Sequence, residues 1–155
     1  MRIRRGTESD LDALVDVNRA SAVTAYASIF GSDPFPTERV RARYRRLLSD
    51  PACVVFLAED GEQTLGFIAA QPHHLAALYV SPSAWGRGAG SRLYDVAMPL
   101  LGWDATLWVL EANARGRCFW ERRGWEPDGE RRIEHGKVEL RYRWRPRTGS
   151  AEGIT

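Results

Sequence analysis

The sequence from residue 78 to residue 91 reads Leu78-Tyr79-Val80-Ser81-Pro82-Ser83-Ala84-Trp85-Gly86-Arg87-Gly88-Ala89-Gly90-Ser91. Its apolar beginning predicts a strand, its Ser-Pro pair ends that strand, and three alternate glycines lead into an amphipathic helix. Glycines at alternate positions let successive backbone N–H groups face one anion, and the following helix N-terminus adds a partial positive charge. The segment therefore suits a diphosphate, with Arg87 as a further cation. The alternative is a glycine-rich turn with no ligand.

Two better-known nucleotide loops do not fit this segment. It lacks GxxxxGK followed by Ser or Thr, and Ser91 stands where the GxGxxG motif has its third glycine. The sequence therefore argues against both a P-loop nucleotide site and a dinucleotide-binding fold.

Around this segment, the hydrophobic period changes several times. Thr7 precedes a first helical pattern, a Pro-rich break follows at 33–36, and Thr37 is expected to cap a charged helix. The expected elements, in chain order, are a strand at 3–5, helices within 8–30 and 37–48, strands at 53–58, 65–70 and 75–80, a helix from about residue 89, a strand at 106–110 and a helix at 114–123. A closing hairpin around Gly136 is expected to begin near Ile133 and to end at Trp144. This order predicts an α/β fold, a mixed α+β sheet flanked by helices.

Length and composition limit the organisation of the chain. With 155 residues and 44% hydrophobic content, we expect one domain over residues 1–145 and a flexible tail at 146–155. The polar N-terminal sequence and the lack of a long apolar run predict a cytoplasmic protein with no membrane partner. Cys53 and Cys118 have no CxxC spacing, so we expect two ordinary buried thiols and no metal. The 22 basic and 20 acidic residues are scattered along the chain, which disfavours nucleic-acid binding.

The glycine segment resembles the acetyl-CoA motif of the GNAT acetyltransferase superfamily. That motif consists of Gln or Arg, two variable residues, Gly, one variable residue, and finally Gly or Ala. In this chain the motif runs from Trp85 to Gly90, with Trp in place of the first polar residue. A second stretch is similar to the family's strand-Asn-helix motif with its Phe-Tyr pair. It comprises Leu107 to Asn113 and Phe119 to Trp125. The resemblance implies a GNAT-like acyl-CoA N-acyltransferase fold with a central, mostly antiparallel sheet.

The resemblance also implies where the cofactor, acetyl-CoA (coenzyme A), would bind. The backbone of Leu78, Tyr79 and Val80 would pair with the pantetheine arm, and Asn113 and Trp120 would contact that arm from a neighbouring strand and helix. The pyrophosphate would be held by the loop residues, namely Trp85, Gly86, Arg87, Gly88, Ala89, Gly90 and Ser91.

An amine acceptor makes a general base valuable. For a group with a pKa near 10.4, deprotonation at pH 7 costs about 4 to 5 kcal/mol, whereas holding a thiolate costs only about 2 kcal/mol. Many family members have a carboxylate four residues before the Leu78 position, and this chain has His74 there. Counting with a period of two puts His74 on the face of Leu78 and Val80. His74 is therefore the candidate base, with an ordinary loop or core histidine as the alternative; Glu111 is a second candidate.

The residue that matches the family's usual acid, a tyrosine, is Trp120, whose indole does not supply a proton. Departure of the thiolate would then be assisted by water, by Tyr79 or by no side chain. For Trp120 itself, the alternative to lining the cofactor arm is a core aromatic residue.

The resemblance puts the acceptor near the N-terminal helices, with lining candidates Tyr26, Phe30, Asp33 and Phe35. We expect direct acetyl transfer to a primary amine of a small molecule or peptide, and a homodimer is possible through the closing hairpin. The alternative function is a non-catalytic acyl-CoA-binding regulatory module.

Overall fold

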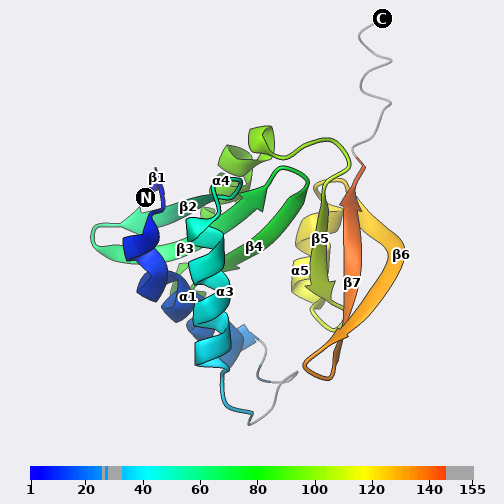
Figure 1. The fold of residues 1–155 in the computed structure, drawn as a ribbon, viewed down its shortest axis with the longest axis horizontal. Helices are drawn as coiled ribbons and strands as arrows, with labels where there is room; N and C mark the ends of the chain where they lie inside the picture. Colours follow the sequence, from blue (N-terminus) through cyan, green and yellow to red (C-terminus); the bar gives the residue numbers. More distant parts are fainter. Residues whose placement is uncertain (26, 28–32, 146–155) are drawn as a thin grey trace, which may run out of the picture. The chain divides into compact units, whose positions relative to one another are not determined.

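The computed structural model describes residues 1–25, 27 and 33–145. The chain divides into two compact units, Met1–Gly102 and Trp103–Thr155. Both units contain an antiparallel sheet; three described α-helices belong to the first unit and one to the second, which confirms the mixed α/β class (Figure 1). Among the described helices, none combines the length and the hydropathy that a membrane crossing requires.

The first unit is built on a four-stranded sheet in which each strand pairs with the next along the chain. Its strands are β1 (Arg2–Arg5), β2 (Val54–Asp60), β3 (Gln63–Gln71) and β4 (His74–Val80). Strand β1 is secured by Arg4, which donates to Glu59 of β2 at 2.7 Å and to Asp10 at 2.7 Å. The Arg4 guanidinium also lowers the pKa of Asp10, whose burial acts in the opposite direction.

Two helices cover one face of this sheet and a third covers the other (Figure 1). Helix α1 (Leu11–Ala25) follows a 3-10 turn at Glu8–Asp10, and α3 (Thr37–Ser49) packs beside it. Helix α4 (Ala89–Ala97) lies on the opposite face. The core between the sheet and α1 with α3 is apolar, and its largest members include Leu14, Tyr44, Leu57 and Phe67.

Strand β4 carries a bulge that the sequence pattern did not reveal. Ala69 of β3 pairs with Ala77, and the next residue, Ala70, pairs with Leu75. Ala76 is therefore an extra residue without a partner in the ladder. A bulge interrupts the alternation of faces, so period-two counting fails across this position.

The second unit contains a three-stranded sheet with β7 in the centre. Its strands are β5 (Thr106–Leu110), β6 (Trp125–Glu134) and β7 (Lys137–Trp144), and α5 (Ala114–Glu121) packs against β6. A wide bulge in β6 leaves three residues opposite Arg141. It is held by Asp128, whose carboxylate accepts from Arg141 Nε at 2.6 Å and from the Glu130 N–H at 3.0 Å.

Most predicted elements are confirmed, with two differences. Thr37 is the first residue of α3 and Pro36 occupies the cap position, so the predicted Thr37 cap is wrong. Strand β6 begins at Trp125, well before the predicted start of the hairpin, because a strand interrupted by Pro127 and Gly129 has no regular alternation. The expected continuation of the first helical region to residue 30 lies partly outside the described residues, as does the tail at 146–155.

Candidate active site

The loop between β4 and α4 has the backbone conformation that its glycines allow. Gly86 and Gly88 have φ of +78° and +84°, a region that residues with a Cβ avoid. A Cβ built at either position would meet nothing within 4 Å, so conformation and not crowding requires glycine. The space above these two glycines is open to a ligand.

Helix α4 begins at the end of this loop and presents its N-terminus there. Gly88 is the residue before the helix, and its carbonyl accepts the first intrahelical bond, from Arg92 N–H at 3.0 Å. Ala89 and Gly90 lie before Arg92 in the first turn, so no carbonyl within the helix can accept a hydrogen bond from their N–H groups. Ser91 completes this first turn. Backbone donors and a helix dipole therefore meet at the loop, as an anion site requires.

Two side chains secure the loop to the rest of the unit. The indole Nε1 of Trp85 donates to the Val80 carbonyl at 2.9 Å, which ties the loop to the end of β4. Arg87 Nη2 lies 2.9 Å from Oδ2 of Asp60, the last residue of β2, and this bond lowers the pKa of Asp60. In the structure, the Arg87 cation is thus paired with a carboxylate.

The preceding strand, β4, presents Leu78, Tyr79 and Val80 as half-buried residues. The Tyr79 ring lies 5.9 Å from the ring of Phe67 and packs against the core beneath α1 and α3. Gly66 lies opposite Val80, and a Cβ there would come within 2.7 Å of the Tyr79 carbonyl. Close backbone approach therefore fixes this end of β4.

His74 is the first residue of β4 and is half-buried. It pairs with Gln71, which shares a face of β3 with Phe67 and Ala69. His74 therefore lies on the face of Tyr79, opposite to Leu78, and the placement by period-two counting is wrong because of the bulge at Ala76. The role of His74 as a base stays a prediction.

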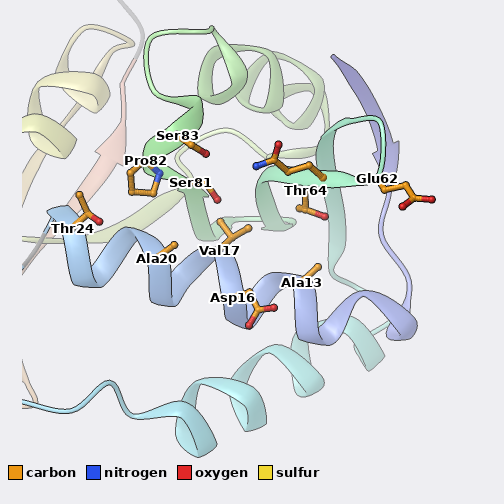
Figure 2. Close-up of a pocket in the computed structure, with 11 residues that line it drawn as sticks. Ala13, Asp16, Val17, Ala20, Thr24, Glu62, Thr64, Ser81, Pro82 and Ser83 are labelled. Carbon is orange, nitrogen blue, oxygen red and sulfur yellow. The ribbon is translucent and has the colours of Figure 1, made fainter.

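A surface pocket of about 690 Å³ lies beside the loop, between α1, the start of β3 and the segment that follows β4 (Figure 2). Small side chains of α1, such as Ala13 and Ala20, leave it hollow. Among the described residues that line it, none is basic. Its polar groups are hydroxyls, carboxylates and one carboxamide, from Asp16, Thr24, Glu62, Gln63, Thr64, Ser81 and Ser83. This lining suits a neutral or cationic group better than a phosphate.

Three predicted site residues belong to the second unit and have structural partners there. Asn113 is the N-cap of α5, and its Oδ1 accepts from Gly116 N–H at 3.0 Å. The Trp120 ring is buried beside Trp125, with ring centroids 5.8 Å apart. The carboxylate of Glu111 lies 3.1 Å from Arg131 Nη2.

The acceptor candidates are only partly described. Tyr26 and Phe30 lie outside the described residues. Asp33 is exposed, and Phe35 packs against the core with the Arg19 guanidinium 5.7 Å from its ring centroid. Neither Asp33 nor Phe35 lines the pocket beside the loop.

The two cysteines have different surroundings. Cys53 is buried, and burial raises the pKa of its thiol to about 11, which suppresses the nucleophilic thiolate. Cys118 is exposed on α5, so the expectation of two buried thiols is wrong for this residue. Among the described residues, no three or more His, Cys, Asp or Glu side chains are grouped so that they could hold a metal ion.

A family model, the acetyltransferase (GNAT) family, matches residues 19–125 of the chain. The chain belongs to the GNAT acetyltransferase family. This confirms the resemblance and makes the protein an acetyltransferase. The match covers the glycine loop and ends at Trp125, the last residue of the second motif.

Individual relatives agree with this GNAT assignment. The peptidyl-lysine N-acetyltransferase YjaB of Salmonella typhimurium is 25% identical over 137 residues, which are 86% of this chain and 89% of the relative. PaiA N-acetyltransferase from Thermoplasma acidophilum, solved in complex with coenzyme A, has a TM-score of 0.71 at 20% identity and covers 90% of this chain and 96% of its own. The apo-form of YjaB from Escherichia coli has a TM-score of 0.71 at 21% identity, and the match covers 92% of this chain and 96% of the YjaB chain. These solved structures share the fold with this GNAT chain.

Sequence reasoning missed three contacts at the GNAT site. They are the bond from Trp85 to Val80, the pairing of Arg87 with Asp60, and a bond from Arg43 to the bulge in β4. The departure of Trp85 from the family motif was the only signal for the first. Nothing in the sequence pointed to the other two, because each joins residues from distant parts of the chain.

Proposed function

We propose that the protein transfers an acetyl group from acetyl-CoA to a primary amine by direct attack within one ternary complex. The observation that carries this proposal is the loop before α4. Gly86 and Gly88 adopt left-handed conformations there, and the first backbone N–H groups of α4 have no acceptor within the helix. Such a cradle fits a diphosphate, which is the most charged part of acetyl-CoA near its pantetheine arm.

Each group in the loop has a defined task in this proposal. The backbone amides from Gly88 to Gly90 bind the pyrophosphate, and Trp85 holds the loop against Val80 through its 2.9 Å bond. Arg87 contributes positive potential while it remains paired with Asp60. The contacts with the arm that we expect from Asn113 and Trp120 stay predictions.

The chemistry needs one new bond and one broken bond. The amine nitrogen attacks the thioester carbon, the carbon–sulfur bond breaks, and the sulfur leaves as a thiolate. The nitrogen loses a proton, for which His74 is the proposed acceptor, and the thiolate takes up a proton to become coenzyme A. Burial raises the pKa of Cys53, so its thiolate is disfavoured as a nucleophile that would form an acetyl thioester on the enzyme.

The acceptor is proposed to be a cationic amine. The YjaB relative is named a peptidyl-lysine N-acetyltransferase, and a lysine side chain is one amine of this kind. A lysine-containing peptide is therefore the first acceptor to test.

Two measurements on the intact protein test the function. A thermal shift should show stabilisation by acetyl-CoA, about 2.7 kcal/mol at 100 times the dissociation constant. A thiol-release assay with lysine peptides, polyamines and other primary amines should then show transfer. Binding without transfer to any amine would support the regulatory module, and the absence of a shift at millimolar acetyl-CoA would contradict the proposal.

A further inference from the structure

The bulge in β4 leaves one residue outside the regular hydrogen-bond ladder. Ala76 has no partner on β3, since Leu75 and Ala77 pair with neighbouring residues of that strand. Arg43 of α3 supplies a partner, because its Nη2 donates a hydrogen bond to the Ala76 carbonyl. A charged donor makes this bond stronger than one between neutral groups.

Arg43 is held in place by its own helix. The next residue, Tyr44, is fully buried, and its hydroxyl accepts from Asn18 Nδ2 at 2.6 Å. The Arg43 guanidinium lies 5.7 Å from the centroid of the Tyr44 ring. Arg41, two residues earlier, pairs instead with Asp12 of α1. Arg43 therefore connects an anchored part of α3 to the irregular point of β4.

The bulge determines which residues share a face of β4. With Ala76 as the extra residue, His74 lies on the face of Tyr79, whereas a regular strand would put His74 on the face of Leu78 and Val80. The bond that holds the bulge thus also fixes the position of His74 relative to the strand segment proposed to bind the pantetheine arm.

We propose that Arg43 is a positioning residue for acetyl transfer, which acts by fixing the bulge at Ala76 and thereby the place of the proposed base. This inference rests on the proposed acetyltransferase function. Arg43 contacts neither substrate nor cofactor in this scheme; its guanidinium orders the backbone on which His74 and Leu78 to Val80 stand.

The test compares Arg43→Met with the wild-type protein, because methionine keeps much of the aliphatic stem and removes the donor. We expect kcat for a lysine peptide to fall by about tenfold or more, since small misplacements of reacting groups are costly. The dissociation constant of acetyl-CoA should change by less than about twofold, because the loop amides are intact. Amide hydrogen exchange at Ala76 and Ala77 should become faster.

Two further variants make the result specific. Arg43→Lys retains a cationic donor and should recover part of the lost kcat, while Arg45→Met, at an exposed position of the same helix, should behave like wild type. If Arg43→Met or, should that variant not fold, Arg43→Ala keeps full kcat and wild-type exchange at Ala76 and Ala77, the inference is wrong. If the wild-type protein transfers no acetyl group to any amine, the proposed function fails first and the inference fails with it.

Discussion

His74 is the side chain on which the proposed proton transfer depends. Replacement by alanine should lower kcat at neutral pH by about tenfold to a hundredfold, because the amine must then lose its proton without a positioned base. At high pH the amine is already neutral, so part of the loss should be recovered. The measurement is the pH profile of kcat for His74→Ala.

The neighbouring His73 provides the matched control for this variant. It is exposed in the turn before β4, and His73→Ala should leave the pH profile unchanged. A profile of His74→Ala that parallels the wild-type curve at every pH would remove His74 from the mechanism.

Asp128 is the residue whose charge most clearly supports the second unit. Burial opposes its ionisation, but the Glu130 N–H and the guanidinium groups of Arg141 and Arg143 outweigh this effect, so its pKa is lowered. The ionised carboxylate therefore stabilises the fold above the unfolded-state pKa of about 3.9, and this stabilisation is lost as the pH falls through the folded-state pKa.

Asp128→Asn should accordingly reduce the free energy of unfolding at pH 7 by about 1 to 3 kcal/mol, as for a buried carboxylate that loses its partners. Urea denaturation at several pH values measures this, and the difference from wild type should shrink below about pH 4. Asp104 also pairs with Arg143, but its side chain is 48% exposed, so Asp104→Asn should cost less than about 1 kcal/mol. Equal losses for both variants would contradict this assignment.

Among the larger elements, the turn into α4 should separate cofactor binding from stability. Gly88→Ala places a Cβ at φ +84°, which costs roughly 1 to 2 kcal/mol of folding free energy and distorts the amides proposed to bind pyrophosphate. Isothermal titration should therefore show acetyl-CoA affinity reduced by at least about tenfold.

The control for this turn is Gly136 in the β6–β7 hairpin. It has φ +75° and open space around it, so Gly136→Ala carries a similar strain without touching the loop. Its acetyl-CoA affinity should equal that of wild type. A comparable loss of affinity in both variants would mean that general destabilisation, and not the loop, was responsible.

Helix α5 offers a second test, because Asn113 has both a structural partner and a proposed ligand contact. Asn113→Ala removes the cap on Gly116 N–H and should reduce stability by about 1 kcal/mol. Asn113→Asp keeps a capping oxygen and should retain stability, while it replaces the amide donor proposed for the pantetheine arm. Chemical denaturation and acetyl-CoA titration of both variants measure the two effects, and an unchanged affinity in Asn113→Asp would remove Asn113 from the cofactor site.

For the molecule as a whole, charge balance predicts poor binding to nucleic acids. The formal net charge is only +2, and many arginines are paired with carboxylates, among them Arg4, Arg87 and Arg141. Fluorescence anisotropy with a short DNA duplex should give a dissociation constant of about 10⁻⁴ M or weaker near physiological salt. Submicromolar binding with a steep salt dependence would support a nucleic-acid function instead. The possible homodimer and the single domain over residues 1–145 also stay predictions.

The sequence by itself determined the class of fold, the family and the glycine loop. These depend on local patterns: the period of apolar residues distinguishes strand from helix, and the left-handed conformations at Gly86 and Gly88 need residues without a Cβ. Local patterns did not predict where β6 begins, because Pro127 and Gly129 interrupt the alternation of apolar and polar residues.

Only the tertiary structure decided the surroundings of the candidate base. The bulge at Ala76 moves His74 to the other face of β4, and its bond with Arg43 joins residues 33 positions apart. Likewise, Arg87 was expected to serve an anion but pairs with Asp60, 27 positions earlier in the chain. Such contacts depend on which elements pack together, and a chain read in order contains no direct signal for them.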